Sequence, residues 1–230
     1  MPSKFIILLR DELSFSSIRY FLVQGLIHYA LLLFCFSILI KPDGSSTSQI
    51  QAFTLIVIFN FILLSMIIPA YFEGDFSDGY LTWLKGRDET LRSYFLAKVI
   101  AGIPLFIIPI VLLSLGCLFC MSLGGSLVVL FPFVLSSMLS LLTGLCWGCL
   151  FQLLVGNNLS GNGSMGTSLL SLLLVPLMIP TFLVGWEFIN ALVQGDYWGY
   201  YLGMQGGLLM ASLAMGLGLA PVIIKHTEIN

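Results

Sequence analysis

No Asp, Glu, Lys or Arg occurs between Val99 and Trp186, and three shorter intervals are also free of charge: 20–40, 44–72 and 197–224. A helix that crosses a bilayer needs roughly 20 apolar residues, so each short interval can cross once and the long one several times. Charged residues make up 9% of the chain, whereas a soluble domain has about a quarter. The sequence therefore predicts an integral membrane protein.

Clusters of Gly, Ser and Asn divide the long uncharged interval near residues 121–126 and 156–168, and such clusters mark turns between helices. The prediction is an all-α, polytopic fold with one transmembrane domain over residues 1–230. Its six expected transmembrane helices cover residues 20–40, 50–71, 99–121, 127–155, 169–186 and 200–224. Residues 1–19 show apolar positions at helical spacing among charges, which favours an interfacial amphipathic helix; a solvated tail is the alternative.

The basic residues predict how the chain is oriented. With the N-terminus inside, eight of the nine Lys and Arg residues fall on the cytoplasmic side, and only Lys41 falls outside. Because short cytoplasmic loops retain Lys and Arg, we expect both termini to be cytoplasmic. The net charge of −2 argues against a nucleic-acid partner, since phosphates attract basic surfaces; the lipid bilayer is the expected surrounding.

Residues 72–98 form the most polar segment, with four of the nine basic and five of the eleven acidic residues. We expect it to be a cytoplasmic loop. Within it Tyr80, Leu81, Trp83 and Leu84 make an apolar patch among charges. Such a patch is typical of a short surface helix offered to another protein, and a plain loop with an aromatic anchor explains it equally well.

Two stretches of the chain resemble a known family. The first contains Phe72, Asp75, Asp78, Gly79, Leu81 and Leu84, followed by Ala97, Lys98, Pro104 and Leu105. The second is LLSLLLVPLMIPTFLVG at residues 169–185, with Pro176, Leu177 and Pro180. In these residues, in length and in the six-helix plan, the chain resembles the haem exporter protein B (CcmB) family, membrane subunits of an ABC-type assembly in cytochrome c maturation.

This resemblance implies an ABC-2-like permease in a bacterial inner membrane or, for an organellar protein, in the mitochondrial inner membrane. The implied permease couples ATP hydrolysis by a separate subunit to haem transport, or to release of a haem-loaded chaperone, for c-type cytochrome biogenesis. The implied partners are a CcmA-like ATP-binding cassette subunit, a CcmC-like haem-handling membrane protein and a small CcmD-like membrane subunit. The implied contacts with the ATPase are Phe72, Asp75, Asp78, Gly79, Leu81, Trp83, Leu84 and Lys98. A permease for polysaccharide or drug, or a scaffold that transports nothing, are the alternatives.

Enzymatic and metal chemistry find little support in the sequence. The chain has no GxxxxGK[ST] motif, so the phosphate cradle of a P-loop is missing and we expect ATP hydrolysis on a partner. Two CxxC pairs, at 117/120 and 146/149, lie inside apolar stretches, whereas zinc sites normally use polar turns. Haem ligation most often uses His, and neither His28 nor His226 has a supporting motif. We expect no catalytic residue, metal or cofactor on this chain, with haem handled by the complex.

Small residues predict where helices approach closely. Ser136, Ser140, Gly144 and Gly148 follow one another at four-residue steps, and Gly203 and Gly207 repeat the spacing. A face of small residues lets helix backbones come close in a membrane, so we expect one of these faces to meet a neighbouring helix or subunit. Asn60, Gln152 and Gln205 are expected to form hydrogen bonds between helices.

Overall fold

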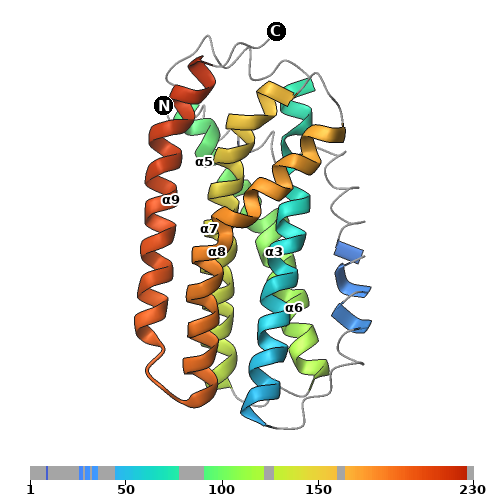
Figure 1. Ribbon diagram of the computed structural model, residues 1–230, viewed down its shortest axis with the longest axis vertical. Coiled ribbons are helices and arrows are strands. Elements are labelled where there is room, and N and C mark those ends of the chain that lie inside the picture. Colours follow the sequence, from blue (N-terminus) through green and yellow to red (C-terminus); the bar gives the residue numbers. More distant parts are fainter. Residues whose placement is uncertain are drawn as a thin grey trace.

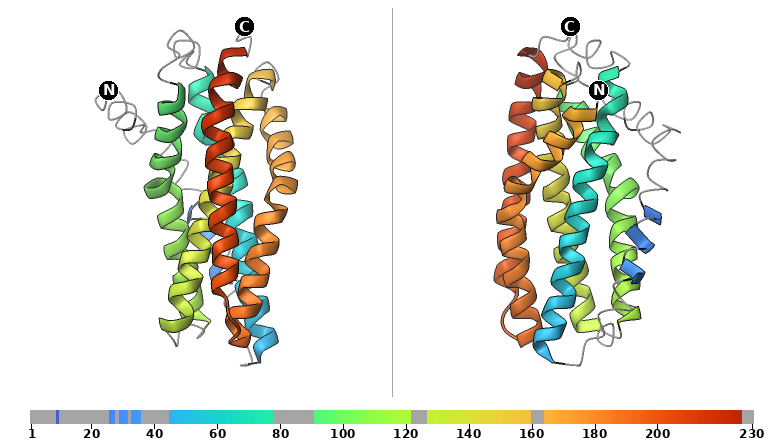
Figure 2. Two further views of the ribbon diagram at one scale, coloured as in Figure 1. Left: turned by 90° about the vertical axis from the view of Figure 1, so that its left-hand side faces the viewer. Right: turned by 45° about the vertical axis from the view of Figure 1, so that its right-hand side comes forward.

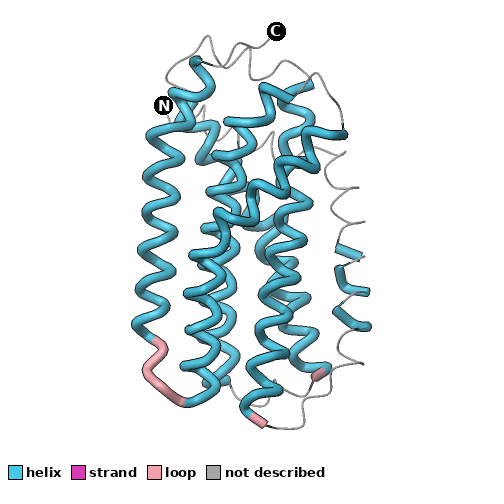
Figure 3. The backbone as a smooth tube through the Cα atoms, viewed as in Figure 1, coloured by secondary structure: helices cyan, strands magenta, loops and turns pink. Residues whose placement is uncertain are grey.

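The computed structural model describes residues 9, 26–27, 29–31, 33–35, 45–77, 91–121, 127–159 and 164–226. Apart from short turns, these residues are helical (Figure 3). The elements are α3 (Ser46–Ser77), α5 (Leu91–Gly102), the π-helix η2 (Ile103–Ile107), α6 (Ile108–Cys120), α7 (Leu127–Leu159), α8 (Ser164–Gln194) and α9 (Gly199–His226). The predicted all-helical class is confirmed for this part of the chain.

The helices run alternately up and down in one elongated bundle (Figures 1 and 2). The last residues of α3, α7 and α9 and the first residues of α5 and α8 share one end of the bundle. We call this end, where α3 ends and α5 begins, the 78–90 end. The turn from α8 to α9 lies at the opposite end, so the end of α3, the start of α5 and the end of α9 lie on the same side, as the orientation argument requires.

Within the part of the chain that the structure describes, four stretches are long and apolar enough to cross a membrane: Ser46–Ile68, Arg92–Cys120, Val129–Leu154 and Gly199–Ile224. They correspond to the second, third, fourth and sixth predicted spans. The fifth prediction, 169–186, falls within α8 and is helical. Of the first, 20–40, the described residues are helical and the others lie outside the description; of the interfacial segment 1–19, only Leu9 is described, and it is helical.

The predicted loop at 72–98 was too long at both ends. Helix α3 continues through Ser77, and α5 begins at Leu91. The physical reason is that Glu73, Asp75, Arg92 and Lys98 mark where the chain leaves apolar surroundings, but charged side chains do not stop a helix. Only residues 78–90 remain between the two helices, and these lie outside the described residues.

One membrane-crossing stretch contains a π-helical segment. Helix α5 passes through η2 into α6, and the backbone N–H of Ile108 donates to the carbonyl of Ile103, a bond to the fifth preceding residue. Pro104 lies at the start of η2 and Pro109 at the start of α6. Proline has no N–H and its ring crowds the preceding turn, so local widening of the helix lets the chain continue where ordinary α-helical bonds are lost.

Helix α8 bends partway along its length (Figure 1). It carries Pro176 and Pro180, and proline inside a helix is the usual cause of such a bend. At its end Gly195 adopts φ +79°, a conformation open to glycine at little cost, while Asp196 N–H donates to the carbonyl of Ala191 at 2.8 Å. This glycine cap closes α8 and turns the chain into α9.

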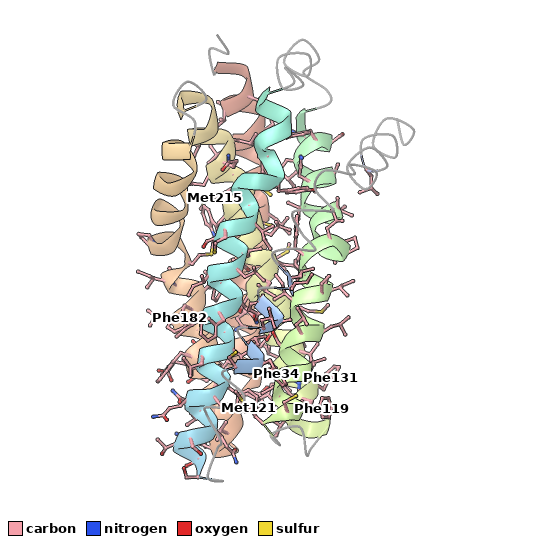
Figure 4. The ribbon with its side chains drawn as sticks, turned by 90° about the vertical axis from the view of Figure 1, so that its right-hand side faces the viewer. Phe34, Phe119, Met121, Phe131, Phe182 and Met215 are labelled. Atoms are coloured by element: carbon pink, nitrogen blue, oxygen red, sulfur yellow. The ribbon has the colours of Figure 1, made fainter. Side chains whose placement is uncertain are left out.

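The core is built around α7, which contacts α3, α5, η2, α6, α8 and α9. Phe53, Phe106, Phe133 and Phe188 are among the buried side chains that fill it. Large apolar side chains also point outward: Phe34, Phe119 and Phe131 are 56%, 61% and 69% exposed, and all lie in the lower part of the bundle in Figure 4. Exposed aromatic rings on helices of this length are expected where the surroundings are lipid.

Candidate functional site

The 78–90 end of α3 and α5 is the candidate functional site because it holds the described part of the expected ATPase contact. Asp75 lies on the last turns of α3. Asp78, Gly79, Leu81, Trp83 and Leu84 lie outside the described residues. The expected contact residues Phe72 and Lys98 are on the helices themselves, 0% and 1% exposed. Their assignment as docking residues was therefore wrong: side chains this deeply buried pack inside the bundle.

Lys98 lies in a cage of aromatic rings. Its Nζ is 4.2 Å from the ring centroid of Tyr71 and 5.0 Å from that of Phe72, both on α3. The ring of Tyr94, one turn earlier on α5, is 5.8 Å away. A cation within about 6 Å of an aromatic centroid is attracted to the negative face of the ring, by about 2 kcal/mol when water is excluded. The cage thus offsets part of the cost of burying an ammonium group.

Tyr71 and Lys98 also exchange hydrogen bonds with each other's backbone. Lys98 Nζ donates to the Tyr71 carbonyl oxygen at 3.3 Å, and the Tyr71 hydroxyl donates to the Lys98 carbonyl oxygen at 3.2 Å. A buried charge is tolerated when hydrogen bonds replace its water. The Tyr71 ring also packs edge-on against Phe106 of η2, with centroids 4.8 Å apart. These contacts fix the end of α3 to the start of the third predicted span.

The predicted small-residue face of α7 packs against α3. A Cβ built on Gly144 would lie 2.8 Å from Leu64 Cδ2, and one built on Gly148 would overlap Ile68. Ser136, on the same face, accepts a hydrogen bond of 2.8 Å from Gln205 Nε2 of α9. The other predicted face is different: around Gly203 and Gly207 nothing described lies within 4 Å of an added Cβ. Of the two faces, only that of α7 meets a neighbouring helix here.

A buried polar cluster joins the N-terminal helical residues to α3 and α6. The hydroxyls of Tyr29 and Ser114 both donate to Asn60 Oδ1, the latter at 3.0 Å. The Ile110 carbonyl oxygen lies 2.8 Å from Ser114 Oγ and shares the single hydrogen of this hydroxyl with Asn60. The role of Asn60 between helices was predicted, but its partners were missed, because nothing in the local sequence around Tyr29 or Ser114 pairs them with a residue of another helix.

The cysteines of the two CxxC pairs differ in how far they are buried. Cys146, Cys149 and Cys117 are buried, whereas Cys120 is exposed. Cys117 Sγ donates to the carbonyl of Leu33 at 3.7 Å, which is packing between helices. Within the described ranges, no three His, Cys, Asp or Glu side chains come together in a way that could hold a metal ion.

The geometry is that of a helical membrane protein whose polar end is held together by a caged lysine. Comparison with protein families matches residues 4–226 to the family described as CcmB protein. None of the curated proteins compared with the chain matches it. The family match covers nearly the whole sequence, including both stretches that carry the resemblance, and agrees with the apolar helices of the structure. The chain is therefore a multi-pass membrane protein that belongs to the CcmB protein family.

Proposed function

We propose that this chain is the transmembrane subunit of an ABC-type complex for haem delivery in c-type cytochrome biogenesis, driven by ATP hydrolysis on a separate subunit. The observation that carries the proposal is the family match over residues 4–226. The delivered species is haem itself or a haem-loaded chaperone. The chain binds no cofactor of its own, and its partners are the CcmA-like ATPase, the CcmC-like haem-handling protein and the small CcmD-like subunit.

In this proposal the chain crosses the bacterial inner membrane six times, with residues 1–19 in the cytoplasmic interface and both termini inside. Support comes from the four apolar stretches, from helix α8 across the fifth predicted span, and from the alternating direction of the helices. The 78–90 end is the cytoplasmic end, because the predicted topology then keeps eight of the nine Lys and Arg residues inside.

Residues 78–90 form the contact with the ATPase. At 1.5 Å per residue the 32-residue helix α3 is about 48 Å long, whereas the hydrocarbon core is about 30 Å thick. Helix α3 therefore reaches beyond the bilayer and carries the segment toward the cytosol on a rigid support. Leu81, Trp83 and Leu84 act as apolar anchors in a groove of the ATPase, since a few such side chains dominate the energy of an interface, while Asp75 and Asp78 orient the segment.

The test is replacement of Leu81 and Leu84 together by Asp in the tagged full-length chain. Neither residue lies in a described helix or predicted span, so the protein should insert and accumulate as the wild type does. Two buried charges at the centre of an interface cost several kcal/mol, so co-purification of the ATPase and formation of c-type cytochromes should both be lost.

A matched control places two acids at the opposite end of the bundle. Tyr197 and Tyr200 are 84% and 64% exposed, so Tyr197→Asp with Tyr200→Asp should leave both the ATPase and cytochrome levels unchanged. If the Leu81/Leu84 variant retains the partner and normal cytochromes, the segment is only a connection between helices, and the proposed contact is wrong.

A further inference from the structure

Helices α3 and α5 flank residues 78–90, yet they are not closely packed along their lengths. Helix α3 packs on α7 and α8 and, further along, on α6, whereas α5 packs on α7 and α9. A force applied at residues 78–90 could therefore part the two helices unless something ties their ends. Tyr71 and Lys98 form such a tie, since the side chain of each donates a hydrogen bond to the backbone carbonyl of the other.

The chemistry of the tie suits lysine. Its flexible stem spans the gap from α5, and its compact ammonium reaches both the Tyr71 carbonyl oxygen and the ring faces of Tyr71 and Phe72 on α3. The 1% exposure of Lys98 excludes water from these contacts, which strengthens electrostatic attraction. Tyr71 extends the tie through its edge-on contact with Phe106, so the tie also reaches η2.

We propose that Lys98 and Tyr71 are positioning residues that fasten α3 to α5, so that both helices move as one unit when the ATPase acts on residues 78–90. This role rests on the proposed function. In contrast to the segment itself, the pair contributes nothing to binding of the ATPase; it turns binding and closure into movement of the membrane helices. A variant that lacks the tie should therefore still bind the ATPase but no longer support formation of c-type cytochromes.

The first measurement needs no partner. Hydrogen exchange of the backbone amides in residues 71–77 and 91–98 is followed in the purified full-length chain. Lys98→Met, which keeps an unbranched stem but removes the cation and donor, should raise exchange in both segments about tenfold. Lys98→Arg, which keeps a cation over the rings, should stay closer to wild type. Arg92→Met, which removes an exposed cation from the same helix, should change neither segment.

The second measurement uses the complex in cells. Lys98→Met should retain the ATPase at the wild-type level while c-type cytochromes fall about tenfold or more; Lys98→Arg should restore most of them, and Arg92→Met should behave as wild type. Unchanged hydrogen exchange in Lys98→Met overturns the tie. Normal cytochromes, or a loss of chain and partner together, overturn its role in coupling. If residues 78–90 prove not to bind an ATPase, faster exchange in Lys98→Met still supports the tie, so the two proposals fail separately.

Discussion

Gln205 Nε2 of α9 donates a 2.8 Å hydrogen bond to Ser136 Oγ of α7, and the Gln205 side chain is completely buried. The amide oxygen of Gln205 has no hydrogen-bond partner among the described residues. Among the described residues, the Ser136 hydroxyl is thus the one hydrogen-bond partner of the Gln205 side chain. The two helices are joined by a bond whose loss would leave a whole amide group unsatisfied in an apolar core.

Ser136→Ala should therefore destabilise the protein by about 1 kcal/mol or more, seen as a lower midpoint of thermal unfolding in detergent. Ser137→Ala is the matched control, because Ser137 is the next residue of α7 and its buried hydroxyl has no described partner; it should be neutral or slightly stabilising. Gln205→Met together with Ser136→Ala should recover most of the loss, since an apolar pair leaves no unsatisfied group. Equal effects of the two Ser→Ala changes would contradict the role of the bond.

Gly216 of α9 receives the ring of Phe95 from α5, and a Cβ added there would overlap the ring. Because Phe95 is fully buried, it has no room to move away, so Gly216→Ala should cost about 1–3 kcal/mol through overpacking. Gly218 lies one half-turn on, with nothing described within 4 Å of an added Cβ. Gly218→Ala should be neutral or stabilise by up to about 1 kcal/mol. Thermal unfolding of the two variants side by side tests this difference, and the same midpoint for both would contradict it.

Asn60 accepts bonds from two hydroxyls, those of Tyr29 and Ser114. Asn60→Leu should cost about 1–2 kcal/mol, because it leaves the Tyr29 hydroxyl with only the weak contact of 3.5 Å to Ser114 Oγ. Tyr29→Phe removes one donor and leaves Asn60 bonded to Ser114, so its effect should be smaller. The midpoint of thermal unfolding should be highest for the wild type, lower for Tyr29→Phe and lowest for Asn60→Leu. A lower midpoint for Tyr29→Phe than for Asn60→Leu would contradict the role of Asn60 as the shared acceptor.

The proposed orientation predicts which introduced cysteines an impermeant thiol reagent can reach in intact cells. The background variant replaces Cys35 and Cys120, the exposed native thiols, by Ala. Cys at position 85 should stay unmodified until the membrane is permeabilised, whereas Cys at position 197, which is 84% exposed at the opposite end, should react from outside. Reaction at position 85 from outside would reverse the topology and remove the basis for an ATPase contact at residues 78–90.

The sequence predicted the helices well because the absence of charge over long stretches leaves few other choices for a membrane chain. It misplaced the ends of α3 and α5, since charges such as Glu73 and Arg92 signal departure from lipid and say nothing about where a helix ends. From the sequence alone Lys98 is predicted to be a loop charge, because its aromatic partner Tyr71 is 27 residues away in the chain. Such pairing depends on how helices meet and leaves no local signal.

For the small residues, too, the local sequence predicts a feature of one helix but not its partner on another helix. The four-residue spacing of Ser136, Ser140, Gly144 and Gly148 was enough to predict a close-packing face on α7. Its partner residues Leu64 and Ile68 on α3 became visible only when the two helices were placed together, because many apolar side chains have a suitable shape. The spacing of Gly203 and Gly207 is alike, yet no described residue packs there, so spacing identifies a face without identifying its occupant.

Haem attachment in cells that lack this chain measures the proposed function most directly. Membranes of the deletion strain are stained for covalently bound haem, and a tagged copy of the chain is returned to restore staining and to recover its partners by mass spectrometry. The expected result is loss of c-type cytochromes on deletion, their return with the tagged copy, and recovery of a P-loop ATPase with it. Wild-type levels of covalently bound haem in the deletion strain would contradict a role in c-type cytochrome biogenesis.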